Sequence, residues 1–196
     1  MIKLTYFVHS TTTDNEQHIS TGWAPGELSK LGIGQAKELT IQTQNMHFDI
    51  VFCSDLKRAI ESADIAFSGK YQIIQDRRLR EANYGELNQH HKSEFNPDPY
   101  WCINNRFPNG ESYKDVEERI SDFLEHLKIN FDNKHIAIVA HKAPQLALDV
   151  LLRNKTWEQA IDEDWRIENK WQPGWIYTFQ EYQHHYKKYN RVAGGF

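Results

Sequence analysis

The sequence has no long hydrophobic run and no excess of positive charge. Its 196 residues carry a formal net charge of -4, whereas binding to a nucleic-acid backbone favours a basic surface. A membrane-spanning helix needs about 20 consecutive apolar residues. No run approaches that length, and no signal-peptide pattern precedes the first apolar segment. We therefore expect a cytoplasmic protein with neither nucleic-acid nor membrane partners.

Cysteine is also scarce. Cys53 and Cys102 are the two cysteines of the chain, and their spacing fits neither a zinc motif nor a redox motif. We expect both to be reduced thiols and expect no metal or cofactor. The chain is long enough for one sizeable core but short for two, and its content of 39% hydrophobic and 26% charged residues is typical of globular proteins. One domain spanning 1–196 is therefore expected.

Short apolar segments alternate with amphipathic ones along the chain. The apolar segments, rich in β-branched and aromatic residues, predict strands at 2–8, 49–53, 71–74, 136–140 and, at a sheet edge, 175–182. Cap residues and helical periodicity predict helices at about 30–43, 54–67, 112–129 and 144–152. Strands that alternate with helices indicate an α/β protein with a parallel or mostly parallel sheet.

Regular periodicity is lost between residues 82 and 110. Asn, Pro, Gly, His and aromatic residues dominate this segment. A long irregular segment inside a compact domain usually carries function or covers a site. We expect residues 82–111 to form a loop region over the active site.

Two of the predicted buried strands end at a histidine. His9 follows the first strand and His141 follows the strand at 136–140, while the strand at 49–53 leads toward Arg58. Open α/β sheets bind ligands at the carboxyl ends of their strands. Two imidazoles, a guanidinium and a helix N-terminus would form a pocket for a phosphoryl group, and a neutral imidazole nitrogen is a good nucleophile toward phosphorus.

Such chemistry also needs an acid for the leaving alcohol. Glu81, at the start of the irregular segment, is the favoured carboxylate. Glu86 and Glu111 lie near the same segment and remain alternatives.

Six segments, in order, resemble motifs of the histidine phosphatase superfamily, whose fold is phosphoglycerate mutase-like. They read VHSTTTDN (8–15), LSKLGIGQA (28–36), SDLKRA (54–59), LREANYG (79–85), GES (110–112, with Arg119) and VAH (139–141). One such match would be weak evidence, but six in the same order are specific. The resemblance implies a three-layer α/β sandwich, with helices on both faces of a mostly parallel central sheet.

The resemblance also implies a role for each matched residue. His9 would be the nucleophile that becomes a phosphohistidine, and Glu81 would protonate the leaving oxygen. Arg58 and His141 would bind the phosphoryl oxygens. Asn15 would bind the phosphoryl group or order its loop. Ser10 and Lys142 complete the predicted substrate-binding residues, and no metal is expected.

Two departures from the family pattern concern the phosphoryl pocket. Val8 stands where the family has an Arg before its nucleophilic histidine, and Ser10 and Lys142 stand where it usually has Gly after each histidine. The missing guanidinium removes a charge-assisted hydrogen bond of about 1.5–3 kcal/mol. Lys142 or Arg80 is a candidate to replace that charge, and we interpret the chain as a divergent branch of the family.

The function expected from these residues is hydrolysis of a phosphomonoester, through a phosphohistidine, on a small phosphorylated metabolite. Two alternatives remain open. One is a phosphomutase of the phosphoglycerate mutase type, which returns the phosphoryl group to bound product. The other is a non-catalytic protein that binds a phosphate ligand. The expected partner is the small phosphorylated substrate, and a homodimer is also left open.

Overall fold

A central five-stranded sheet organises the protein, in a computed structural model that describes residues 1–94, 97–165 and 174–179. Its strand order is β4-β3-β6-β1-β7. The strands are β1 (Ile2–Val8), β3 (Ile50–Cys53), β4 (Ile73–Gln75), β6 (His135–Ala140) and β7 (Trp175–Phe179). All neighbours pair in parallel except β7, which runs antiparallel to β1 at the edge. The part of the last predicted strand beyond residue 179 lies outside the described residues.

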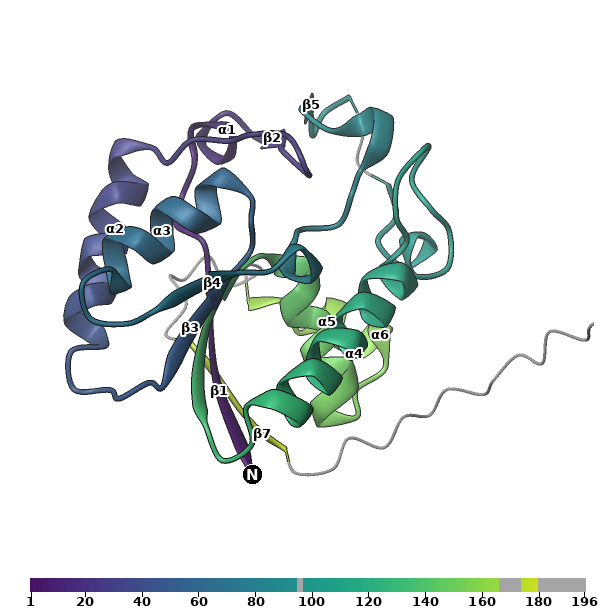
Figure 1. Ribbon diagram of the computed structural model, residues 1–196. Helices are drawn as coiled ribbons and strands as arrows, with labels where there is room; N and C mark the ends of the chain where they lie inside the picture. Colours follow the sequence, from purple (N-terminus) through teal and green to yellow (C-terminus); the bar gives the residue numbers. More distant parts are fainter. Residues whose placement is uncertain (95–96, 166–173, 180–196) are drawn as a thin grey trace, which may run out of the picture.

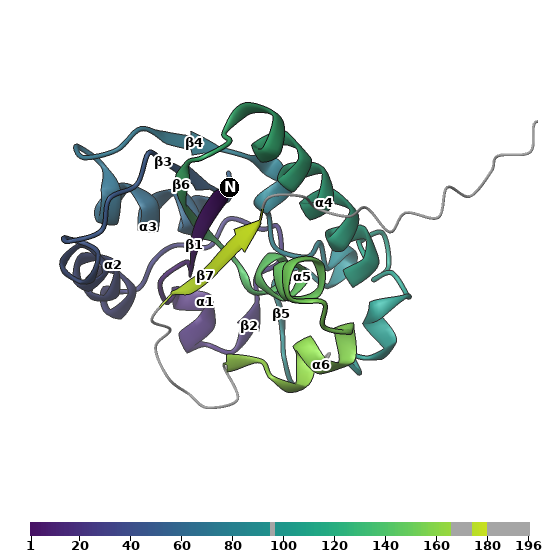
Figure 2. The same cartoon turned by 90° about the horizontal axis from the view of Figure 1, so that it is seen from below.

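Helices cover both faces of this sheet (Figures 1 and 2). On one face lie α2 (Lys30–Gln42) and α3 (Lys57–Phe67), and on the other lie α4 (Tyr113–Asn130) and α5 (Lys142–Arg153), with α6 (Trp157–Asp162) packed against α5. The predicted three-layer sandwich with a mostly parallel sheet is therefore confirmed.

Alternation along the strands gives the protein two apolar cores. Successive side chains of a strand point to opposite faces of the sheet. Tyr6 and Phe52 accordingly pack in the larger core under α4 and α5, whereas their neighbours Phe7 and Cys53 pack in the smaller core under α2 and α3. Because both faces are buried, the parallel strands appear in the sequence as continuous apolar runs.

Both cysteines lie inside the protein as free thiols. Burial raises the pKa of Cys53 to about 12 and the pKa of Cys102 to about 11. Thiols with such pKa values are poor nucleophiles at neutral pH, so neither cysteine is a candidate for the chemistry of the site.

Two helix starts agree with their predicted caps and one does not. Ser29 caps α2, and Ser112 caps α4 in a capping box with Asp115. Residues 54 and 55, in contrast, do not cap α3, which starts after Leu56 without a side-chain cap. The carboxylate of Asp55 instead binds Arg80, with two contacts of 2.7 Å.

Helix α5 begins two residues before its predicted start. The carboxylate of Glu81 accepts hydrogen bonds from the backbone N–H groups of Lys142 and Ala143, at 3.3 and 3.0 Å. The first N–H groups of a helix lack partners within the helix and need an external acceptor. Here the acceptor lies about sixty residues away in the sequence, so no local pattern could indicate it.

The predicted irregular segment contains short ordered pieces. These are η2 (Gly85–Leu87), β5 (His90–His91) and η3 (Trp101–Ile103). Strand β5 pairs with β2 (Ile19–Ser20), which follows the short helix α1 (Thr13–Glu16). Figure 1 places α1, β2 and β5 beyond the carboxyl end of β1, where the histidines lie.

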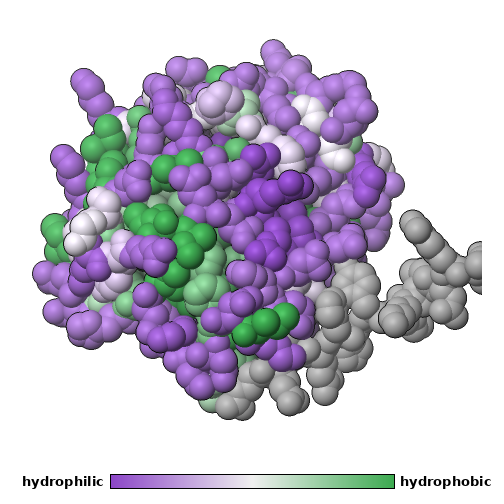
Figure 3. All heavy atoms as spheres, in the orientation of Figure 1, coloured by the Kyte–Doolittle hydropathy of each residue, from purple (hydrophilic) through white to green (hydrophobic). Residues whose placement is uncertain are grey.

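The surface agrees with the absence of long apolar segments. None of the helices in the described ranges is long and apolar enough to cross a membrane. The face in Figure 3 is mostly hydrophilic, with an apolar area over β4, whose Ile73 and Ile74 are half-buried. This area lies at an edge of the sheet, away from the strand ends that carry the histidines.

We expect Leu124→Ala to lower the free energy of unfolding by about 2–5 kcal/mol, because it opens a cavity in the larger core. Leu124 is fully buried on α4, whereas Ile129 on the same helix is 77% exposed. Ile129→Ala is therefore the matched control and should change stability by less than about 0.5 kcal/mol. Urea unfolding measures both, and equal effects would contradict the described packing of α4.

Candidate active site

The pairing of β1 with β6 brings the two predicted histidines together. Val8 is in register with Ala140, so His9 and His141 leave adjacent parallel strands side by side. The backbone N–H of His9 donates to the carbonyl of Ala140 at 2.8 Å. The two imidazole rings lie with their centroids 5.0 Å apart.

The contacts of the His9 ring define its tautomer. Nδ1 lies 2.8 Å from the carbonyl oxygen of Ser10, which can only accept, so Nδ1 carries the proton. Nε2 accepts from Nε of Arg58 at 3.2 Å. An arginine can only donate, so Nε2 holds a lone pair. His9 is therefore a neutral imidazole whose Nε2 lone pair lies in the pocket, which is the form a nucleophile needs.

Arg58 presents a buried positive charge to His9. Its side chain is 2% exposed, and its terminal nitrogens donate to the carbonyls of Gly22 at 2.8 Å and Ala24 at 3.3 Å. Burial lowers the pKa of the guanidinium below its ordinary value, and the nearby carboxylate of Glu81 opposes this shift. The group still carries its charge at neutral pH, in surroundings that screen it less than water does.

The loop that receives Arg58 requires a glycine at position 22. Gly22 has φ of +55°, and a Cβ there would lie 1.8 Å from the side-chain oxygen of Asn88. Any side chain would therefore strain this backbone and displace Asn88, whose side-chain oxygen accepts from the N–H of Trp23 in the same loop.

His141 is completely buried beside His9 and Arg58. Burial lowers the pKa of its imidazole well below 6.5, and the positive charge of Arg58 lowers it further. Among the described residues neither ring nitrogen has a hydrogen-bond partner. The backbone is held by Tyr6, whose hydroxyl donates to the His141 carbonyl at 2.6 Å and accepts from its N–H at 2.9 Å. A fixed neutral imidazole with unsatisfied nitrogens is suited to bind a ligand oxygen.

Glu81 lies at the other side of the pocket, between two sets of donors. Its carboxylate accepts from the start of α5, as described above, and from the N–H of Ala82 at 2.9 Å. Its own carbonyl accepts from the Trp23 indole at 2.6 Å and from Arg119 at 3.0 Å. Backbone and carboxylate are therefore both fixed.

The two alternative carboxylates lie elsewhere. Glu86 accepts from the side chain of Asn109, and Glu111 pairs with Arg119 at 2.9 Å. Of the three candidates, Glu81 lines the pocket and Glu86 and Glu111 do not.

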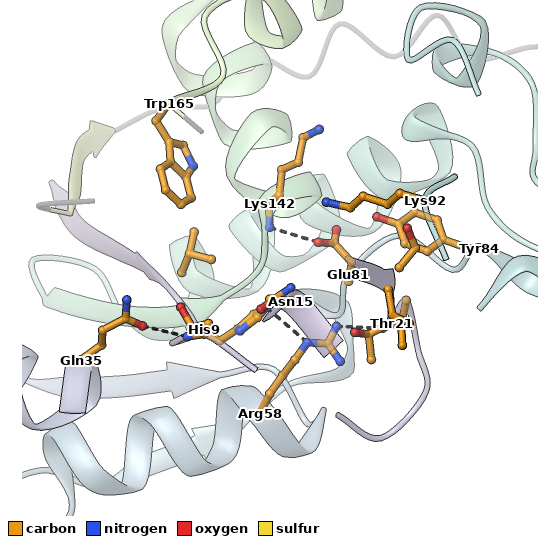
Figure 4. A pocket seen from close by; sticks show the side chains of 15 residues that line it. His9, Asn15, Thr21, Gln35, Arg58, Glu81, Tyr84, Lys92, Lys142 and Trp165 are labelled. Carbon is orange, nitrogen blue, oxygen red and sulfur yellow. Dashed lines mark hydrogen bonds between the residues drawn. The ribbon is translucent and has the colours of Figure 1, made fainter. Parts of the chain in front are cut away.

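The pocket has a volume of about 570 Å³ and an open side. Figure 4 shows His9 and Arg58 at its inner end, with Glu81 opposite them. Its lining includes residues from both covering segments, 8–22 and 81–92, among them Asn15, Thr21, Tyr84 and Lys92. The predicted loop region thus contributes Tyr84 and Lys92 to the wall.

The further predicted binding residues differ in where they lie. Asn15 lines the pocket, and its side chain caps α1 by accepting from the N–H of Thr12 at 3.0 Å. Ser10 does not line the pocket: its side chain is buried, and its N–H donates to the hydroxyl of Ser62 at 2.9 Å. Ser10 contacts the site through its carbonyl, which fixes the His9 tautomer.

The two cations considered as replacements for the missing Arg are paired with carboxylates. Val8 itself lines the pocket. The ammonium of Lys142 lies 3.3 Å from the carboxylate of Asp164, and Figure 4 shows its side chain pointing away from His9 and Arg58. Arg80 binds Asp55 and stacks over Trp23, with 4.6 Å between the guanidinium carbon and the ring centroid. In this arrangement the charge beside His9 comes from Arg58.

Several residues that shape the site were not assigned by the sequence analysis. Tyr6 donates a hydrogen bond to the backbone of His141, and Trp23 donates one to the backbone of Glu81. Gln35 and Trp165 belong to the pocket lining. Tyr6 appears in the sequence as an ordinary core residue. Gln35 and Arg119 lie in segments that match the family motifs, which was the available signal for them.

Comparison with known proteins agrees with this geometry. The family model described as histidine phosphatase superfamily (branch 1) matches residues 6–190, so the chain belongs to this superfamily. An adenosylcobalamin/alpha-ribazole phosphatase of Salmonella typhimurium is 31% identical over 145 residues, which are 68% of this chain and 71% of that protein. A 2,3-bisphosphoglycerate-dependent phosphoglycerate mutase of Streptococcus agalactiae is 35% identical over 100 residues, 48% of this chain and 44% of the mutase.

A solved structure shows the same architecture. The alpha-ribazole phosphatase from Shigella flexneri superposes with a TM-score of 0.71 at 26% identity, covering 82% of this chain and 84% of that chain. The predicted family is confirmed. Its known relatives include phosphatases and phosphomutases, and they leave the substrate of this chain open.

We expect the buried neutral His141 to make stability fall in acid. Its folded-state pKa lies below the ordinary 6.5, so below about pH 6.5 the unfolded chain binds a proton that the folded chain excludes. Above that pH, His141 is neutral in both states and causes no loss of stability. As the pH falls below it, protonation of the unfolded chain lowers the free energy of unfolding. His141→Gln should therefore lose about 1.4 kcal/mol less than the parent between pH 7.5 and 5.5. Urea unfolding at both pH values measures this, and parallel losses in the two proteins would contradict a neutral His141.

Proposed function

We propose that this protein is a phosphomonoester hydrolase that acts through a phosphohistidine at His9. The observation that carries the proposal is the His9 imidazole, whose Nε2 lone pair lies 3.2 Å from the buried guanidinium of Arg58. A nucleophile and a fixed positive charge thus lie next to each other at the inner end of the pocket. The family relationship supports the same chemistry, because relatives of this chain are phosphatases.

The first half of the reaction transfers the phosphoryl group to the enzyme. Nε2 of His9 attacks phosphorus, and the bond between phosphorus and the ester oxygen breaks. Glu81, opposite His9 in Figure 4, gives a proton to that oxygen, so the product leaves as a neutral alcohol. Arg58 exchanges its hydrogen bond to Nε2 for hydrogen bonds to the phosphoryl oxygens. His141, at the end of β6, binds the same oxygens.

The second half of the reaction returns the enzyme to its starting state. Glu81, now ionised, removes a proton from a water molecule, whose oxygen attacks phosphorus. The bond between Nε2 and phosphorus breaks, and inorganic phosphate is released. Because the charge of Arg58 and the two imidazoles stabilise the phosphoryl oxygens, the proposal requires no metal ion.

The proposed substrate is a small phosphorylated metabolite. The pocket is open on one side and holds about 570 Å³, which falls in the range of small-molecule sites. Hydrolysis is favoured over mutase chemistry for two reasons. A mutase must bind a doubly phosphorylated intermediate, and Val8 replaces a phosphate-binding Arg. The phosphatase relatives also share a larger part of the chain, 68% against 48% for the mutase.

A phosphoryl group on His9 is the first expected outcome. The parent, quenched during turnover of an aryl phosphate in excess chelator, should carry an acid-labile phosphoryl label on His9. His9→Ala should remove both the label and turnover, at unchanged thermal stability. A label on another residue would refute the assigned nucleophile. Activity that requires added metal would refute the metal-free mechanism.

The role of Glu81 can be tested through the leaving group. A nitrophenolate leaves with little protonation, whereas an alkoxide needs a proton. Glu81→Gln should therefore lower kcat/KM for an alkyl phosphate about 10²-fold or more, and far less for nitrophenyl phosphate. Glu86→Gln, outside the pocket, is the control and should resemble the parent. Equal losses on both substrates would show that Glu81 positions groups rather than donating a proton.

A further inference from the structure

A second cavity adjoins the active-site pocket. Its volume is about 230 Å³, and it shares four lining residues with the pocket: Ser20, Tyr84, Lys92 and Lys142. Figure 4 shows three of these, Tyr84, Lys92 and Lys142, on the side of Glu81 remote from His9. The two cavities therefore meet beyond Glu81, and the second one continues the space available to a bound molecule.

The lining of the second cavity is mixed: Ser20, His90 and the two lysines are polar, and the rest of the wall is apolar or aromatic. Leu87, Pro97, Pro99 and Tyr113 contribute to the apolar part, and Phe107 lies edge-on to Tyr84 with 5.0 Å between ring centroids. Apolar and aromatic walls around a small volume favour a flat apolar group, which loses contact with water on entering.

The direction of the substrate follows from the chemistry of Glu81, so this inference depends on the proposed function. If Glu81 protonates the leaving oxygen, that oxygen lies at Glu81 while phosphorus faces His9. The organic part of the ester then extends away from His9. In this structure that direction leads to the junction of the two cavities.

Two ammonium groups border this junction. Lys142 stands where the family usually has Gly, and its side chain is 16% exposed with its ammonium 3.3 Å from Asp164. An ammonium has three N–H donors, and Lys142 contributes to the lining of both cavities. Lys92 also lines both cavities. A carboxylate or a second phosphate on the substrate would find charge-assisted donors at this point.

We propose that the preferred substrate is a phosphomonoester whose alcohol carries a second anionic group near the ester and a planar apolar group beyond it. The anionic group binds at the lysine junction, and the apolar group occupies the second cavity.

Four synthetic phosphate esters test both features separately. Their alcohols are propan-1-ol, 3-hydroxypropanoate, 2-benzylpropan-1-ol and 2-benzyl-3-hydroxypropanoate, which combine a carboxylate and a benzyl group in all four ways. We expect each feature to raise kcat/KM about tenfold, corresponding to about 1.4 kcal/mol. The ester with both features should be the best substrate.

Two variants assign the preferences to their sites. Lys142→Met keeps the aliphatic stem and should lower kcat/KM for the carboxylate esters about tenfold more than for the neutral ones. Lys37→Met, on the exposed surface of α2, is the matched control and should retain the full preference. Leu87→Trp fills the second cavity and should selectively lower kcat/KM for the benzyl esters. Thermal unfolding checks that each variant folds.

The outcomes separate this inference from the proposed function. Equal turnover of the four esters, with His9 phosphorylated, would overturn the substrate class and leave the phosphatase intact. A preference for one feature alone, or one that Lys142→Met does not reduce, would also contradict it. If no ester is turned over and no phosphohistidine forms, the proposed function fails. In that case, calorimetry measures the affinity of the same four esters for His9→Ala. Tighter binding from both the carboxylate and the benzyl group supports the proposed recognition, and equal affinities contradict it.

Discussion

The hydrogen bond from the His9 N–H to the Ala140 carbonyl, 2.8 Å long, is the contact on which the site depends. It continues the parallel register of β1 and β6 by one residue beyond Val8 and Ala140. Because of it, two histidines that are far apart in the sequence have ring centroids 5.0 Å apart, at the carboxyl ends of β1 and β6. A slip of one residue would turn the side chain of His9 to the other face. The strands cannot slip easily, since apolar side chains are buried on both faces of the sheet.

The remaining groups of the site are fixed by acceptors and donors of the backbone. Carbonyls at residues 22 and 24 hold the guanidinium of Arg58, and the first N–H groups of α5 hold the carboxylate of Glu81. Such contacts cost little reorganisation when charge develops during a reaction. Glu81 also satisfies donors at the start of α5, so one carboxylate serves both the fold and the proposed chemistry. His9 and Arg58 at one end of the pocket and Glu81 opposite them are therefore in place before any ligand binds.

The sequence predicted the parts of this arrangement that depend on local pattern. Apolar runs located the strands, Ser29 and Ser112 located helix starts, and the two strand-end histidines located the pocket. It did not predict the start of α5 or the ionic partners of Asp55 and Lys142, because these depend on side chains that are distant in the sequence. The choice among Glu81, Glu86 and Glu111 needed the fold as well. Lys142 illustrates the limit: its position after His141 suggested a phosphoryl ligand, whereas its ammonium pairs with Asp164 and its side chain points away from His9 and Arg58.

The central claim is that His9 is a neutral imidazole with its proton on Nδ1 and its lone pair on Nε2. Nitrogen-15 NMR of the histidine side chains tests this directly, because protonated and lone-pair nitrogens differ strongly in chemical shift. With His9→Gln used to assign the signals, we predict a lone-pair shift for Nε2 and a protonated shift for Nδ1 at neutral pH. Adding vanadate, a mimic of the phosphoryl group, should move the Nε2 signal and leave Nδ1 protonated. A proton on Nε2, or an Nε2 signal that vanadate does not move, would contradict the account.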